Sequence, residues 1–138
     1  MDAPGYIQRL SQWFVAEPSS VPAARQAAEG ARGVLGSSAC ERVCLLVSEL
    51  VANAVRHGSR SPGDTVRMRI WTSSGTIRVA VRDRGKGSKR PVRSESSDVG
   101  GWGLLLVESL ADRWGTDRGR VTEVWFEIDT KSSPATPA

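Results

Sequence analysis

Ser48-Glu-Leu-Val-Ala-Asn-Ala-Val-Arg-His-Gly58 is apolar enough for a buried helix, yet it places Glu49, Asn53 and His57 at intervals of four residues. At 3.6 residues per turn, side chains at this spacing drift by only about 40° per step, so all three project along one side of the helix. A carboxylate or an amide buried there without a partner would cost several kcal/mol. We call these three residues the polar stripe and expect it to face a partner, such as a hydrated cation with its bound ligand.

Length and composition limit the class of protein around this helix. The chain has 138 residues, of which 39% are hydrophobic, which fits one globular domain with a core and is too short for two. Its longest apolar run, residues 43–55, is interrupted by polar residues, and the N-terminus carries no basic-then-apolar leader. We therefore expect a soluble, cytoplasmic protein with no membrane partner. Cys40 and Cys44 are spaced for neither a zinc ribbon nor a disulfide, and we interpret them as small buried hydrophobic residues in a reducing compartment.

The formal net charge of +4 raises the question of nucleic-acid binding. The arginines are scattered among apolar and acidic residues, with no run of five like charges and no aromatic RNA-binding signature. This distribution indicates a solvated basic surface, which also attracts phosphates or an acidic protein partner. We expect no direct contact with nucleic acid.

Two helices are predicted in the first half of the chain. Ser20 precedes Val21-Pro22, so it suits the start of a helix with Pro22 in its first turn, and alanine-rich sequence continues to about residue 35. Ser38 is the predicted cap of a second helix, which carries the polar stripe to about residue 56 and closes at His57-Gly58.

The remaining pattern predicts strands and one more helix. Residues 12–16 suit an edge strand; residues 66–71 and 76–82 alternate apolar with basic residues around Ser73-Ser-Gly75, which predicts a hairpin with one wet face. Helices should therefore cover one face of the sheet only. Residues 88–100 predict a mobile loop, 103–112 a helix and 121–129 the strand that closes the sheet. This order predicts an α+β sandwich, with residues 12–130 as the domain, 1–11 as a flexible lead and 131–138 as a disordered tail.

Two glycine-rich segments have positions that suit a ligand. Asp83-Arg-Gly-Lys-Gly87 leaves a strand end at a carboxylate and then permits close backbone approach. Gly100-Gly-Trp-Gly103 precedes a helix, where free N–H groups and the helix dipole favour phosphate. Each segment alone is also typical of a hairpin exit or a flexible joint. The sequence contains neither a Walker-type phosphate loop nor a dinucleotide fingerprint.

Taken in order, four motifs carry a family resemblance: Glu49-x-x-x-Asn53-Ala-x-x-His57-Gly58, Asp83-x-Gly85-x-Gly87, Gly101-x-Gly103-Leu104 and Gly119-x-x-Thr122-x-Val-Trp-Phe-Glu127. The chain resembles the anti-sigma-factor serine kinases of the histidine-kinase-like GHKL superfamily and their regulatory relatives in actinobacteria, over about residues 13–129. The resemblance implies the Bergerat fold: a two-layer α/β sandwich with a mixed, mostly antiparallel sheet, helices on one face, and ATP between the Asn helix and a lid.

At the phosphate end, the resemblance implies that Asn53 binds the Mg²⁺ that bridges the ATP phosphates, as an oxygen ligand suits that hard ion. Glu49 is the implied general base, which takes the proton of a protein serine hydroxyl as it attacks the γ-phosphate. Gly101 and Gly103 are implied to give backbone N–H groups to the phosphates, and Leu104 completes that nucleotide-binding motif.

At the adenine end, the resemblance implies that Asp83 accepts a hydrogen bond from the adenine amino group and that Gly85 and Gly87 leave room for the base. Thr122 is implied to support this end through a hydroxyl near Asp83. His57 matches the family pattern, but a histidine at a helix C-terminus is typically a cap, so we leave it outside the catalytic set.

The implied function is an ATP-dependent anti-sigma factor that controls transcription by partner switching. It would bind a sigma factor and phosphorylate a STAS-type anti-anti-sigma partner on serine. The alternative is a non-catalytic ATP-binding regulator on the same fold; Glu49 favours the enzyme, because loss of the base is a simple way to lose catalysis. We also expect a homodimer through the open sheet edge or face, for which the Trp13 region is a candidate.

Overall fold

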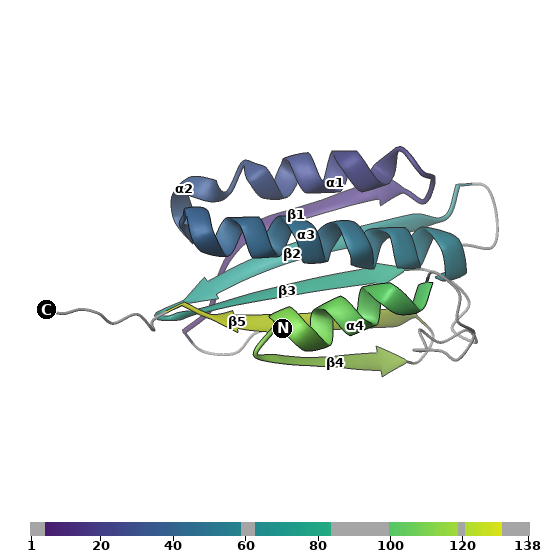
Figure 1. Cartoon of the computed structure of the whole chain (residues 1–138). Helices are drawn as coiled ribbons and strands as arrows, with labels where there is room; N and C mark the ends of the chain where they lie inside the picture. The colour runs from purple at the N-terminus through teal and green to yellow at the C-terminus, as the bar shows by residue number, and fades with distance from the viewer. Residues whose placement is uncertain (1–4, 59–62, 84–99, 119–120, 131–138) are drawn as a thin grey trace, which may run out of the picture.

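The computed structural model describes residues 5–58, 63–83, 100–118 and 121–130, which form two layers (Figure 1). One layer is a five-stranded sheet in the order β1-β2-β3-β5-β4, and every strand pairing that these residues make is antiparallel. The strands are β1 (Ile7–Val15), β2 (Thr65–Ser73), β3 (Thr76–Asp83), β4 (Arg113–Arg118) and β5 (Thr122–Asp129).

The second layer consists of helices that cross one face of the sheet, as the sequence predicts (Figure 1). They are α1 (Ser20–Glu29), α2 (Arg32–Leu35), α3 (Ser37–Asn53), the π-helical turn η1 (Ala54–Gly58) and α4 (Gly100–Leu110). None of the helices in the described ranges is long and apolar enough to cross a membrane. The predicted α+β sandwich is therefore confirmed.

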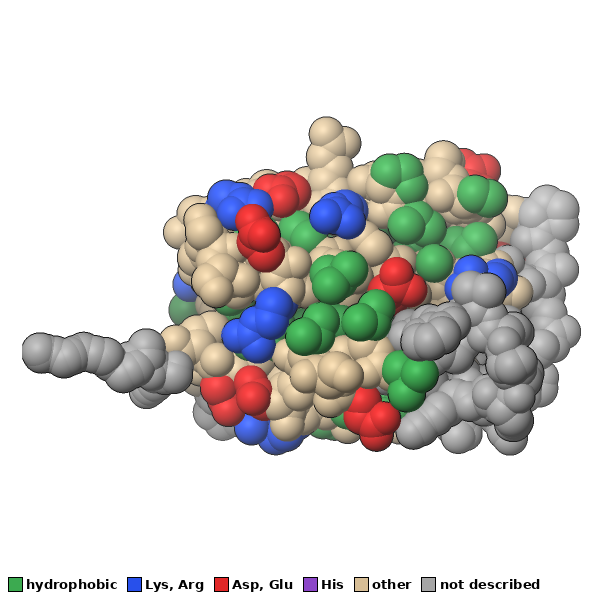
Figure 2. All heavy atoms as spheres, viewed as in Figure 1, with side chains coloured by type: hydrophobic (Ala, Val, Ile, Leu, Met, Phe, Trp, Pro, Cys, Tyr) green, Lys and Arg blue, Asp and Glu red, His purple; other side chains and the backbone are tan. Residues whose placement is uncertain are grey.

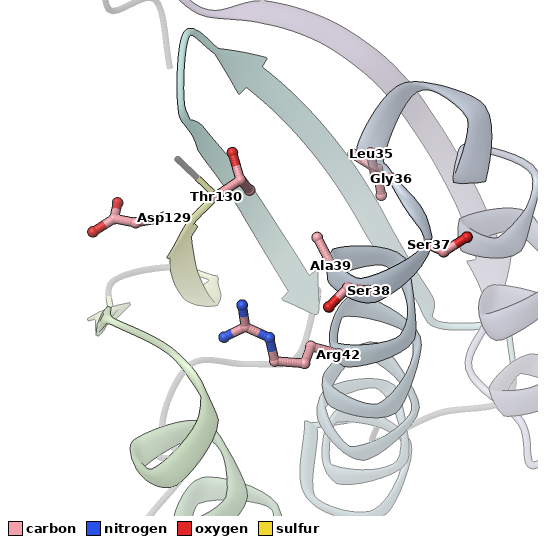
Figure 3. Close-up of a pocket in the computed structure, with 8 residues that line it drawn as sticks. All are labelled: Leu35, Gly36, Ser37, Ser38, Ala39, Arg42, Asp129 and Thr130. Carbon is pink, nitrogen blue, oxygen red and sulfur yellow. The ribbon is translucent and has the colours of Figure 1, made fainter. Parts of the chain in front are cut away.

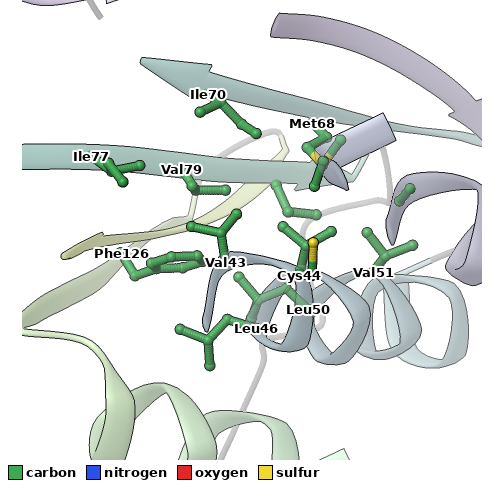
Figure 4. Close-up of a cluster of buried hydrophobic side chains, with 14 of the residues drawn as sticks. Val43, Cys44, Leu46, Leu50, Val51, Met68, Ile70, Ile77, Val79 and Phe126 are labelled. Atoms are coloured by element: carbon green, nitrogen blue, oxygen red, sulfur yellow. The ribbon is translucent and has the colours of Figure 1, made fainter. Parts of the chain in front are cut away.

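The core lies between α3 and the inner face of the sheet (Figure 4). Alternate residues of the β2–β3 hairpin point inward, as the apolar–basic alternation predicts. α3 contributes apolar residues on the side toward the sheet, and α4 adds Val107, which is fully buried. The largest of the fully buried side chains are Phe126, Leu46, Leu50, Met68, Ile70 and Ile128.

The first predicted helix is divided in two. Residues 21–35 were expected to be continuous, but α1 ends at Glu29 and α2 is a separate short helix. Ser20 is not the cap; it is the first helical residue, and its hydroxyl donates to the carbonyl of Val15, which ties α1 to the end of β1. Ser38 is not a cap either, because α3 begins at Ser37, after Gly36 with a φ of +91° that only glycine adopts easily.

The sheet has a longer strand at one edge and an additional strand at the other, compared with the prediction. β1 begins at Ile7, so part of the expected flexible lead is paired with β2. β4 was not predicted, because Arg-Trp-Gly-Thr-Asp-Arg lacks alternation and contains residues that strands disfavour. Pairing with β5 imposes the strand, so β5 is an inner strand and β4 forms the edge. Gly115 suits this pairing, since a Cβ there would lie 2.8 Å from the indole of Trp125.

The outer face of the sheet is less wet than expected. Trp71 is 4% exposed and Arg69 is 9% exposed, because arginines lie over indoles and pair with glutamates across the strands. The Arg69 guanidinium lies 4.9 Å from the Trp71 ring centroid, and that of Arg78 lies 4.2 Å from the Trp125 ring. We call this face the arginine–tryptophan face. Ring stacking and ion pairing there replace much of the hydration that a basic strand face would otherwise have.

Candidate functional site

The polar stripe lies at the C-terminal end of α3. Glu49 and Asn53 both belong to the regular α-helix, one turn apart, and Asn53 is only 6% exposed while Glu49 is half-buried. The π turn η1 begins directly after Asn53 and contains His57. Hydrogen bonds in a π turn join residues five apart. The alignment along one side of an α-helix therefore holds for Glu49 and Asn53 but does not extend to His57. The side chain of His57 lies outside the described part of the structure.

Asp83 and Thr122 are direct neighbours across the β3–β5 pairing. Asp83 is the last residue of β3 and half-buried, and Thr122 is the first residue of β5 and 5% exposed. Opposite residues of an antiparallel pair have Cβ atoms about 5 Å apart. The structure thus brings together a carboxylate and a hydroxyl-bearing residue that are far apart in the sequence.

The end of α3, the end of β3 and the start of β5 all lie at one side of the molecule, where α4 also begins (Figure 1). η1 packs against β3, and α4 packs against α3. The predicted Glu49–Asn53 and Asp83–Thr122 pairs therefore share one end of the two-layer sandwich. The topology places a helix end, a strand end and a helix start around a common region, which we call the motif end.

The glycine motifs are described only in part. Gly85 and Gly87, with the expected loop over residues 88–99, lie outside the described residues. The sequence pattern placed Gly101 and Gly103 before the helix, but α4 begins at Gly100, so both glycines lie in its first turn. Leu104 follows them in the same helix. The first N–H groups of any α-helix lack partners within the helix. The backbone donors of this motif are therefore the helix start itself.

The residues at the motif end suit a magnesium nucleotide by their chemistry. The side chain of Asn53 offers an amide oxygen, a donor type that Mg²⁺ accepts. The start of α4 offers backbone N–H groups and the positive end of a helix dipole. Asp83 offers a carboxylate that can accept from an amino group. The donor set is thus compatible with ATP and Mg²⁺.

A pocket lies at the opposite end of α3 (Figure 3). Its volume is about 390 Å³, and it opens between the start of α3 and the end of β5, with Arg42 and Asp129 on opposite walls. Arg42 also donates to the carbonyl of Leu110 at 3.2 Å. None of the residues that the sequence predicts for nucleotide binding lines this cavity, so we do not assign it to that site.

A supporting pair at the motif end was not predicted. Arg82 and Glu123 are cross-strand neighbours next to the Asp83–Thr122 pair, and their side chains form an ion pair of 3.3 Å on the opposite face of the sheet. Glu123 also pairs with Arg69 at 2.9 Å. The signal was present in the sequence as opposite charges beside each site residue, but the register was needed to bring them together.

The fold and the motif end agree with one family of known proteins. A two-layer α+β sandwich with these motifs at one end is typical of one class of nucleotide-binding domain. The sequence pattern of the histidine kinase-like ATPase domain matches residues 14–128, and the chain belongs to that family. No match was found among curated proteins.

Two solved structures share the fold. The histidine kinase domain of the blue-light activated histidine kinase of Erythrobacter litoralis EL346 aligns with a TM-score of 0.55 and 23% identity, over 84% of this chain and 61% of that one. A second structure of the Erythrobacter litoralis EL346 blue-light activated histidine kinase aligns with a TM-score of 0.52 and 30% identity, over 65% of this chain and 30% of that one. This chain thus spans less than two thirds of the structures it resembles.

Proposed function

We propose that this protein is a cytoplasmic anti-sigma factor that binds Mg-ATP and phosphorylates a serine of a STAS-type anti-anti-sigma protein. The observation that carries the proposal is the position of Glu49, one regular helical turn before the buried Asn53 at the motif end. Loss of this carboxylate is a simple way to lose catalysis, so its presence favours an enzyme over a non-catalytic regulator, although such a regulator can also keep it.

In the proposed reaction, Glu49 accepts the proton of the serine hydroxyl as the serine oxygen bonds to the γ-phosphorus. The bond between the γ-phosphorus and the ADP oxygen breaks, so the products are phosphoserine and ADP. General-base catalysis of this kind contributes about 10²- to 10⁴-fold to a rate. Bound Mg²⁺, with Asn53 as its protein ligand, supplies charge neutralisation on the phosphates.

The remaining residues are proposed to hold the nucleotide. Asp83 accepts from the adenine amino group and Thr122 supports it from the neighbouring strand, which selects adenine over guanine. Gly85 and Gly87 give the base room, and the start of α4 holds the phosphates through the N–H groups of the Gly101–Leu104 segment.

Partner switching requires that one surface of this protein bind either of two proteins, but not both at once. We propose that the sigma factor is bound in the ATP state and is released when the anti-anti-sigma protein binds instead, which regulates transcription without direct contact with nucleic acid. We further propose a homodimer, supported by the exposed apolar side chains of the edge strand β1. A non-catalytic regulator that uses ATP only to set its shape is the alternative.

The test is incubation with Mg-ATP and a candidate anti-anti-sigma protein. Wild-type protein should transfer phosphate to serine, and Glu49→Ala should lower the rate by about 10²-fold or more while it still binds ATP. Glu41→Ala, which removes an exposed glutamate at the other end of α3, is the matched control and should be as active as wild type.

The chemistry of the product separates the candidate functions. Phosphoserine is stable in acid and phosphohistidine is not, so acid treatment distinguishes the proposed serine kinase from the histidine kinase activity named for the similar structures. ATP binding with no phosphate transfer to any candidate would favour the non-catalytic regulator. Equal rates for wild type and Glu49→Ala would exclude Glu49 as the base.

A further inference from the structure

Two cysteines and one glutamate meet where α1 packs on α3. Cys40 and Cys44 lie one turn apart on α3 and are 0% and 1% exposed, and Glu29 is the last residue of α1. The two sulfurs are 3.9 Å apart, and the Cys44 sulfur lies 3.7 Å from Oε2 of Glu29. The three possible ligand atoms all lie within 4.8 Å of one another. We call these residues the thiol cluster.

Two of the three distances in the thiol cluster match those around a tetrahedral metal ion, and the third, from the Cys40 sulfur to the Glu29 carboxylate, is within 4.8 Å. Zn–S bonds of about 2.3 Å at tetrahedral angles place two sulfurs about 3.8 Å apart, and a Zn–O bond of about 2.0 Å places sulfur and oxygen about 3.5 Å apart. The observed 3.9 Å and 3.7 Å are close to both values. A disulfide fits less well, since its sulfurs would have to approach to about 2.05 Å.

Charge balance supports the same ligand. Arg32 donates to both carboxylate oxygens of Glu29, at 2.7–3.1 Å, and so fixes the orientation of that side chain. Two thiolates and one carboxylate carry three negative charges, which a divalent cation and the Arg32 guanidinium neutralise together. An outer partner that orients a ligating carboxylate is a usual feature of metal sites.

The Cys44 thiol keeps its proton in the metal-free protein. Burial, together with neighbouring Cys40, raises the pKa of the Cys44 thiol to about 12. The two S–H groups have acceptors at the end of α1, with Cys40 donating to the carbonyl of Ala28 at 3.6 Å and Cys44 to that of Arg25 at 3.8 Å. A metal would displace both protons, and its fourth position would be open to water or to one of these carbonyls.

We propose that the thiol cluster is a site for a thiophilic divalent cation of the Zn²⁺ type, which would join α1 to α3 away from the motif end. The side chain of Glu29 is 42% exposed and provides the entry to the buried sulfurs. Figure 2 shows basic and acidic side chains side by side at the end of the molecule where α1 passes into α2. This site needs no nucleotide and is independent of the proposed kinase activity.

The test is titration of the reduced full-length chain with Zn²⁺ and, for its thiolate-to-metal absorption, with Cd²⁺. Wild type should bind one ion per chain, show the thiolate absorption and gain thermal stability, because the ion binds only the folded site. Cys40→Ala/Cys44→Ala should lose the absorption and the thermal shift.

Glu29→Gln and Glu41→Gln are the matched pair that makes the test specific. Both glutamates pair with Arg32, but Glu41 lies outside the thiol cluster. Glu29→Gln keeps both thiols and the core, and should weaken binding by about tenfold or more, as loss of even an outer-shell partner does. Glu41→Gln should bind as wild type does.

Three results would overturn the proposal. The first is wild-type protein with no thiolate-to-metal absorption, which would leave the cysteines as packing residues only. The second is equal weakening by Glu29→Gln and Glu41→Gln, which would reflect surface charge and not ligation. The third is unchanged metal binding by the double cysteine variant; if that variant does not fold, the comparison of the two glutamate variants decides.

Discussion

At the residue scale, the position of Asp83 in the candidate site depends on its strand partner Thr122. Alone it is a carboxylate at a strand end, but the β3–β5 register sets it opposite Thr122 at the motif end. Its proposed hydrogen bond to the adenine amino group requires an acceptor. An asparagine in its place has one acceptor oxygen, but its NH₂ group is a donor and would meet the adenine amino group as a second donor in the other orientation.

Asp83→Asn should therefore weaken ATP binding by about 1–3 kcal/mol, or roughly 5- to 150-fold, measured by calorimetry. Asp129→Asn is the matched control, because Asp129 is exposed and lies at the other end of the same strand pairing. The control should bind ATP normally. Unchanged affinity of Asp83→Asn would exclude the adenine contact.

At the element scale, charged side chains on the arginine–tryptophan face join β3, β4 and β5. Glu127 receives hydrogen bonds from Arg113 at 2.8 Å, Arg78 at 3.1 Å and Tyr6 at 3.2 Å. Burial alone would raise the pKa of Glu127, but these three donors outweigh it and hold the pKa below its usual value. The ionised form is thus favoured in the folded protein.

A lowered pKa in the folded state fixes the direction of the pH effect. The stability that ionised Glu127 contributes is fully present above the unfolded-state pKa of about 4.3 and is lost as pH falls through the lower folded-state pKa. Glu127→Gln should therefore lose less stability than wild type between about pH 5 and pH 3. Urea unfolding at a series of pH values measures this, and parallel curves for the two proteins would contradict the assignment.

At the scale of the whole molecule, the sandwich leaves one edge strand with exposed apolar side chains. Ile7 is 56% exposed, Trp13 51% and Val15 48%, all on β1, whose outer edge has no strand beside it in the described structure. An edge of this kind favours pairing with another chain. Arg67 of the neighbouring strand β2 lies over the indole of Trp13, with its guanidinium 5.2 Å from the ring centroid.

If the proposed homodimer uses this edge, Trp13→Glu should shift the protein to monomer in light scattering over a concentration series. Val34→Glu is the control, because Val34 is equally exposed at 51% but lies on α2, in the helix layer. The control should keep the wild-type mass. A dimer that survives Trp13→Glu would place the interface elsewhere.

Local patterns in the sequence were sufficient for the sandwich, the β2–β3 hairpin, the helix that carries Glu49 and Asn53, and the histidine kinase-like ATPase family. These depend on periodicity and on motif residues within one element, where side-chain direction follows directly from backbone geometry. Burial of Cys40 and Cys44 was likewise predicted and is confirmed. The roles of the nucleotide-site residues remain predictions.

Only the tertiary structure decided what depends on contacts between distant segments. Pairing with β5 makes a strand of Arg113–Arg118, whose own residues do not favour one. Stacking on indoles buries Arg69 and half-buries Arg78, which the alternating pattern assigned to water. The π turn separates His57 from the four-residue spacing, and the packing of α1 on α3 sets Glu29 beside the two thiols. Spacing along one chain cannot encode these outcomes, because the register and packing of several elements are settled together.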